Sequence, residues 1–134
     1  MKHLLVAALL FVSTYGKGQF YFNFSENQIR NTFSSQADKI DVLTISGEKT
    51  IMVQLYSTVY AFKLNKQTGL CDFYSVRVDD PQLVLKWIDD FTNNYTVLVE
   101  GQKWKTKFKS ITVGITRRYT ASTNAISFLF YKIT

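Results

Sequence analysis

The sequence predicts an α+β fold, in which an antiparallel sheet of about seven or eight strands carries two helices on one face. Three observations lead to this prediction. Two segments have helix caps followed by apolar residues at helical spacing, eight segments are rich in β-branched and aromatic residues, and turn residues separate several of those eight. Elements of these kinds bury their apolar sides by packing helices against one face of a sheet.

The first helix is predicted to begin after Ser25, because Ser25 and Gln28 have the spacing of a capping box. The apolar stripe expected to follow at roughly helical spacing consists of Ile29, Phe33, Ala37 and Ile40.

The second helix is predicted to begin at Asp79-Asp80-Pro81, where acidic caps precede a proline in the first turn. Its end is marked by Asn93-Asn94. The buried face expected between these points consists of Leu83, Val84, Trp87, Ile88 and Phe91.

The remaining segments are predicted strands. Val, Ile, Thr, Tyr and Phe are enriched in them, and these residue types suit a pleated surface. The expected strands are 40–46, 50–56, 58–64, 70–78, 95–100, 103–109, 110–118 and 125–133, with 19–23 as a candidate for a short additional strand. Each half of the chain thus contains a capped helix followed by four strands, so a duplicated α-β-β-β-β unit is one way to build the fold.

Residues 1–18 are predicted to be a secretory signal peptide. Lys2 supplies positive charge, an apolar run covers residues 4–12, and Gly16 and Gly18 place small residues before Gln19. A buried helix or a membrane anchor is the alternative, but the run is well short of the roughly 20 residues that span a bilayer. We therefore expect one domain, residues 19–134, exported to the periplasm or secreted, without a transmembrane segment. Cleavage after Gly16 is a second option.

The small number of cysteines and histidines limits the disulfides, metal sites and catalytic mechanisms that the chain can have. Cys71 is the only cysteine, so no intrachain disulfide is possible, and a bacterial rather than an animal secreted protein is favoured. Cys71 has no basic neighbour in sequence and is expected to be a buried, inert thiol. The only histidine is His3, inside the predicted signal peptide. Histidine-based catalysis and His/Cys zinc sites are therefore excluded from the mature chain, and we expect no cofactor, no metal and no enzymatic activity.

Carboxylates are the remaining candidates for catalysis. The pairs Asp79-Asp80 and Asp89-Asp90 are neighbours in predicted helical segments, where adjacent residues do not face each other. Asp89-Asp90 is expected on the exposed side of its helix. An enzyme that uses two distant carboxylates, such as Asp72 and Glu100, is the least favoured alternative.

The chain also resembles small exported bacterial proteins, mostly of unassigned function. The resemblance lies between residues 60 and 104, in Tyr60-Ala-Phe62, Gly69-Leu-Cys71, Tyr74, Tyr95 and Trp104. It implies an envelope or secreted location and an α+β fold, and it implies no activity.

Positive charge is concentrated at the C-terminal end. Residues 101–134 contain seven Lys/Arg and no Asp/Glu. Within them, Lys103, Lys105, Lys107 and Lys109 alternate with other residues, so we expect all four on one side of a strand. Arg117-Arg118 on the next strand is expected to extend this surface. Either the surface binds an anion, or the lysines are the solvated side of a sheet or the guard of an edge strand.

The predicted function is an exported, non-catalytic binding module that engages an anionic partner, an acidic protein or an envelope polymer. The predicted binding residues are Lys103, Lys105, Lys107, Lys109, Arg117 and Arg118. Nucleic acid is the least favoured anion, because an exported protein seldom meets it. An aromatic patch of Tyr56, Tyr60 and Tyr74 is a candidate for glycan stacking, unless these residues lie in the core. The alternative function is a small envelope structural or inhibitor-like protein with a different contact surface.

Overall fold

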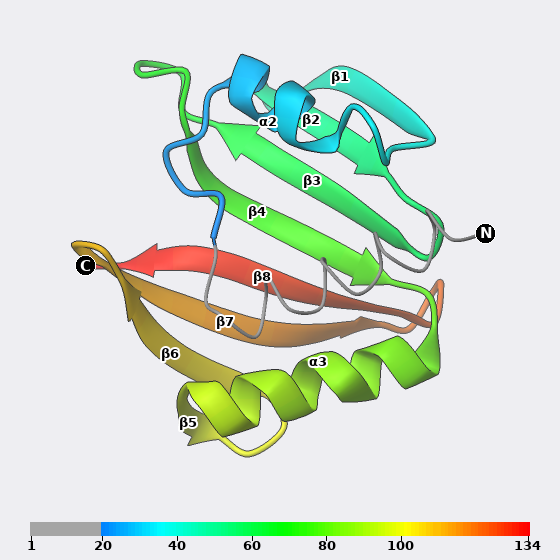
Figure 1. The fold of residues 1–134 in the computed structure, drawn as a ribbon, viewed down its shortest axis with the longest axis vertical. Helices are drawn as coiled ribbons and strands as arrows, with labels where there is room; N and C mark the ends of the chain where they lie inside the picture. The colour runs from blue at the N-terminus through cyan, green and yellow to red at the C-terminus, as the bar shows by residue number, and fades with distance from the viewer. Residues whose placement is uncertain (1–19) are drawn as a thin grey trace.

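The computed structural model describes residues 20–134, and the predicted signal peptide lies outside these residues. The described chain forms one eight-stranded antiparallel sheet with the strand order β1-β2-β3-β4-β8-β7-β6-β5 (Figure 1). The helices are α2 (Glu26–Phe33) and α3 (Pro81–Asn94). The strands are β1 (Lys39–Ile45), β2 (Glu48–Gln54), β3 (Thr58–Leu64), β4 (Cys71–Val78), β5 (Thr96–Val99), β6 (Lys103–Phe108), β7 (Ile111–Thr120) and β8 (Ala125–Ile133).

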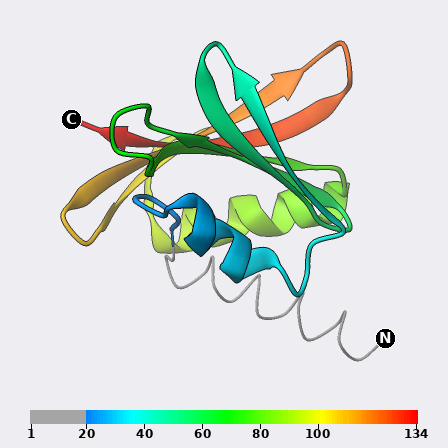
Figure 2. The same cartoon turned by 90° about the horizontal axis from the view of Figure 1, so that it is seen from above.

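The predicted α+β architecture is confirmed. Each half of the chain is a helix followed by four sequential strands, and the halves meet where β4 pairs with β8 in the middle of the sheet. Both helices lie on the same side of the sheet (Figure 2). The sheet therefore has a helix-covered face and an open face, which none of the helices in residues 20–134 covers.

Helix α2 begins with the predicted capping box. Ser25 Oγ accepts a hydrogen bond from the Gln28 amide at 3.2 Å, and Gln28 Oε1 accepts one from the Ser25 amide at 2.8 Å. The predicted apolar stripe is only half correct, because the helix ends at Phe33. Ala37 follows the turn at residues 34–36 and Ile40 lies in β1, since the Ser34-Ser35 pair that follows Phe33 favours caps and turns over helix.

The structure confirms the predicted boundaries of helix α3. Asp80 is the N-cap and accepts a hydrogen bond from the Gln82 amide at 2.9 Å, Pro81 occupies the first turn, and the last helical residue is Asn94. Within its apolar face, Trp87 and Phe91 pack against Phe128 of β8.

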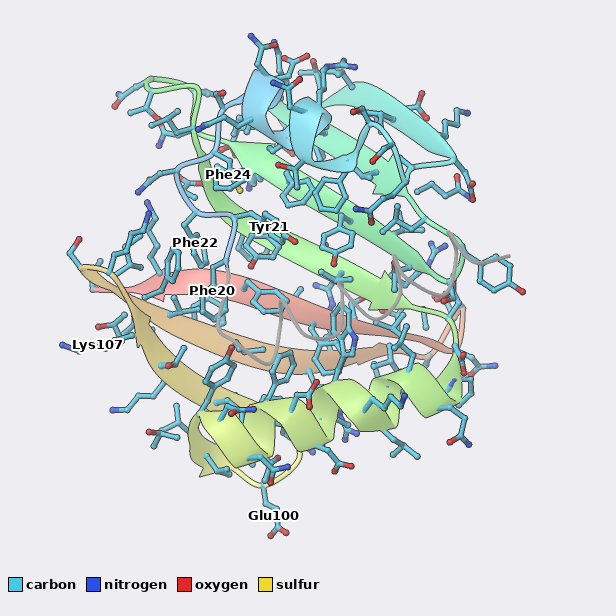
Figure 3. All side chains as sticks on the ribbon, in the orientation of Figure 1. Phe20, Tyr21, Phe22, Phe24, Glu100 and Lys107 are labelled. Carbon is cyan, nitrogen blue, oxygen red and sulfur yellow. The ribbon has the colours of Figure 1, made fainter. Side chains whose placement is uncertain are left out.

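Residues 20–24 do not form the candidate additional strand. Asn23 has a positive φ of 67°, which turns the backbone. The turn makes two hydrogen bonds with the start of β4, from the Asn23 amide to Cys71 O at 2.7 Å and from the Cys71 amide to Phe24 O at 2.8 Å. Phe20, Tyr21 and Phe22 are buried in the core, and Figure 3 shows the segment running between the two helices.

The prediction that Asp89 and Asp90 are both exposed is wrong for Asp90. Asp89 is exposed, but Asp90 is half-buried, and its Oδ2 atom is buried without a hydrogen-bond partner in the described chain. Burial, with a further contribution from the negative charge of Asp89, raises the pKa of Asp90 above the ordinary aspartate value. Folding thus favours the protonated form of Asp90.

We expect Asp90→Asn to stabilise the protein at pH 7 by about 0.5 kcal/mol, because it removes a charge that burial disfavours. A raised folded pKa contributes stability at low pH that is lost as the pH rises through it. The advantage of Asp90→Asn over the parent should therefore disappear below the ordinary aspartate pKa of about 3.9. Urea unfolding at pH 7 and pH 3 measures this, with Asp89→Asn as the control for removing one exposed charge. An advantage that is equal at both pH values would contradict the prediction.

Candidate functional site

The open face is the only large surface of the described sheet that lacks a helix, and the strand register determines which side chains it carries. Residues directly opposite each other in paired strands project to the same side. Trp104 packs on α3 through Phe91, and Trp104 pairs with Ile115, which pairs with Phe130. These residues define the covered face, so the alternate residues of β6, β7 and β8 lie on the open face. They are Lys103, Lys105, Lys107, Thr112, Gly114, Thr116, Arg118, Ser127, Leu129, Tyr131 and Ile133.

Three of the four predicted lysines share the open face. Lys103, Lys105 and Lys107 are exposed, and Trp104 between them is buried. Lys107 is labelled in Figure 3, where its side chain extends away from the sheet. We call these three residues the lysine row.

Lys109 does not belong to the lysine row, which corrects the prediction. Strand β6 ends at Phe108, and Lys109 lies in the turn to β7 with a φ of 56°. Its Nζ atom lies 5.3 Å from the centroid of the Phe108 ring. The turn redirects the side chain, so the alternation of a strand no longer applies to it.

Arg117 and Arg118 project to opposite sides of the sheet, so only one of them extends the lysine row. Arg118 pairs with Ser127 and lies on the open face, whereas Arg117 pairs with Phe128 and lies on the covered face. The prediction that both contribute is therefore wrong for Arg117, because consecutive residues of a strand alternate.

The two halves of the open face differ in whether their cations form ion pairs. On the side of β1 to β4, Lys39 pairs with Asp41 at 3.4 Å and Lys63 with Glu48 at 3.0 Å. Arg77 pairs likewise with Asp79 at 3.1 Å. On the side of β6 to β8, none of the lysine row or Arg118 makes an ion pair within residues 20–134. Four cations on this half of the sheet therefore have no carboxylate within ion-pair distance in residues 20–134.

An aromatic row, Phe73 and Tyr131, crosses the centre of the open face beside the lysine row. Phe73 pairs with Tyr131, Tyr131 with Gly114, and Gly114 with Lys105. A Cβ atom on Gly114 would lie 2.4 Å from Cε2 of the Tyr131 ring, so the ring occupies the space above the glycine. The Tyr131 hydroxyl then lies 2.8 Å from Thr116 Oγ1.

Sequence reasoning missed the aromatic row and named other tyrosines. Tyr60 and Tyr74 are buried in the core, and Tyr56 is exposed alone, so the candidate patch of these three does not exist. The available signal was Gly114, since a glycine inside a strand marks a close approach of another group.

The two distant carboxylates considered for catalysis lie apart from one another in residues 20–134. Asp72 lies on β4 and Glu100 follows β5, and three strands separate β4 from β5 in the sheet. Cys71 is buried as predicted, and burial raises its pKa to about 12, so the thiol is neutral at pH 7. Residues 20–134 contain no cluster of three or more His, Cys, Asp or Glu with the geometry of a metal site.

Comparisons with protein-family models, curated proteins and solved structures found no match for this chain. Within the described chain, neither helix has the length and apolar character needed to cross a bilayer.

Proposed function

We propose that this protein is an exported, non-catalytic binding module that holds an anionic partner on the lysine row and Arg118. The observation that carries the proposal is the asymmetry of the open face. The cations of β1, β3 and β4 have carboxylate partners, whereas those of β6 and β7 have none in the described chain. Unpaired exposed cations on one surface attract anions and steer their approach.

Three further features support a binding role for a bacterial periplasmic or secreted protein. Residues 1–18 have the order of charge, apolar run and small residues of a signal peptide. The chain beyond His3 contains no histidine, and the two distant carboxylates considered for catalysis lie apart, with Asp72 on β4 and Glu100 beyond β5. The lysine row lies on a rigid sheet, which keeps its charges at constant spacing.

The alternative, a structural or inhibitor-like envelope protein with another contact surface, is favoured by a different observation. Edge strand β1 exposes the apolar residues Val42, Leu43 and Ile45. An exposed apolar edge strand is a template for pairing with another chain. In that case the lysine row is only the solvated side of the sheet.

The variant Lys103→Gln/Lys105→Gln/Lys107→Gln tests the proposal. Three exposed ion pairs of about 0.5 kcal/mol each sum to about 1.5 kcal/mol, so we expect roughly tenfold weaker binding to anionic polymers. The measurement is retention on heparin and poly-L-glutamate columns in a salt gradient. The parent should elute from both at higher salt than the variant, because salt screens exposed charges.

The matched control is Lys39→Gln/Lys49→Gln/Lys63→Gln, which removes the same charge from lysines that are already paired with Asp41, Glu26 and Glu48. We expect the control to lose less retention than the lysine-row variant. Equal losses would show that retention follows net charge alone, and this would refute the lysine row as a site.

A further inference from the structure

We infer that the anionic partner is an acidic polysaccharide, and that the Tyr131 ring is the platform on which a sugar ring stacks beside the lysine row. This inference rests on the proposed function, and it adds the class of partner and a residue that recognises it. Tyr131 is half-exposed at the centre of the open face, in the same row as Gly114 and Lys105.

The Tyr131 ring already has a defined position before any ligand binds. Gly114 has no side chain, so the ring lies across the backbone of β7 instead of standing away from it. The hydroxyl contact with Thr116 Oγ1 at 2.8 Å holds the ring in this position. A ring that is held in place loses little side-chain entropy when a ligand covers it.

The groups around Tyr131 match the polar groups of an acidic sugar. Thr112 and Thr116 of β7 lie on the open face on either side of Gly114. The Thr112 side chain adds a hydroxyl group, whereas the Thr116 hydroxyl is hydrogen-bonded to Tyr131. Lys105 is in the same row as the ring, with Lys103 and Lys107 on either side of it along β6. A carboxylate or sulfate of the polymer therefore meets an ammonium group when a sugar ring covers Tyr131.

A protein partner fits this half of the face less well. The cores of protein interfaces are depleted of Lys and Ser, and Thr and Ser are under-represented among the residues that dominate binding energy. The surroundings of Tyr131 consist largely of these types. They include Lys103, Lys105, Lys107, Thr112, Thr116 and Ser127.

Nucleic acid also combines rings with negative charge, and single-strand binding surfaces stack successive bases on several aromatic residues. Tyr131 is the only aromatic residue on the open face of β6, β7 and β8. Phe73 adjoins it on β4, where the neighbouring Lys63 is already paired with Glu48. The predicted export also places the protein where it seldom meets nucleic acid.

The experiment titrates the full-length mature protein with sodium alginate, a polyuronate, and with poly-L-glutamate of similar length, by calorimetry at low salt. The variants are Tyr131→Leu, which removes the ring and keeps an apolar side chain, and Tyr131→Phe, which keeps the ring. We expect Tyr131→Leu to weaken alginate binding about tenfold and to leave poly-L-glutamate binding unchanged. Tyr131→Phe should bind alginate within about twofold of the parent.

The outcomes separate this inference from the proposed function. If Tyr131→Leu binds alginate as the parent does, or weakens both polymers equally, stacking on Tyr131 is refuted while the lysine row stands. If poly-L-glutamate or an oligo-dT strand binds more tightly than alginate, the partner is an acidic protein or a nucleic acid and the inference fails. Circular dichroism of Tyr131→Leu checks that the sheet is intact. If it is not, Gly114→Ala, whose added methyl group displaces the ring without removing it, replaces Tyr131→Leu in both titrations with the same expected results.

Discussion

Replacing Tyr21 by alanine is expected to destabilise the protein by about 3–5 kcal/mol, the range for truncating a large buried aromatic side chain. Tyr21 is only 3% exposed. Its ring lies 5.5–6.0 Å, between centroids, from the rings of five residues in four parts of the chain. These are Phe24, Phe33, Tyr60, Phe62 and Tyr74. Truncation leaves a cavity between α2 and the sheet that the surrounding rings cannot fill.

The matched control is Tyr56→Ala, because Tyr56 is 86% exposed and has no comparable packing. We expect it to change the free energy of unfolding by no more than about 0.5 kcal/mol. Urea unfolding followed by tryptophan fluorescence measures both variants. A loss below about 1 kcal/mol for Tyr21→Ala would mean that residues 20–24 do not pack in the core as described.

Gly114→Ala is expected to cost about 1–3 kcal/mol, the usual cost of adding a methyl group where no space exists. The added Cβ would lie 2.4 Å from Cε2 and 2.6 Å from Cζ of Tyr131, so the ring has to swing away from β7. That movement also breaks the contact between the Tyr131 hydroxyl and Thr116. The same variant should bind alginate more weakly, since the platform is displaced.

A double-mutant cycle with Tyr131→Ala tests the cause of this cost. If the clash with the ring is responsible, Gly114→Ala should cost at least about 1 kcal/mol less when Tyr131 is already alanine. Urea midpoints of the parent, the two single variants and the double variant give the coupling free energy. Additive effects would mean that Gly114→Ala destabilises the protein through the β7 backbone and not through a clash with the Tyr131 ring.

Local signals in the sequence predicted most of the secondary structure. The Ser25–Gln28 capping box and the Asp80-Pro81 start were confirmed because caps depend on residues within one helical turn. The strands were located by β-branched and aromatic runs between turn residues, with errors of a few residues at their ends. One such error placed Lys109 in a strand when it lies in a turn.

The candidate site was only partly predictable. The alternation of Lys103, Lys105 and Lys107 with buried Trp104 is a local property of one strand, and the structure confirms it. The same alternation shows that Arg117 and Arg118 cannot share a face. The sequence could not show which charges are neutralised. Lys63 on β3 pairs with Glu48 on β2, and the spacing of residues within one strand does not reveal a contact between two strands.

The sequence by itself determined the fold class, the helix caps, the order of the elements and the concentration of positive charge in residues 101–134. Only the tertiary structure decided which strands meet. The pairing of β4 with β8 joins the two halves and brings Phe73 beside Tyr131, and the register of β8 on β7 places Tyr131 over Gly114. Such pairings join residues far apart in the chain. They are selected by how the whole sheet buries its aromatic face under α2 and α3, which no local sequence window contains.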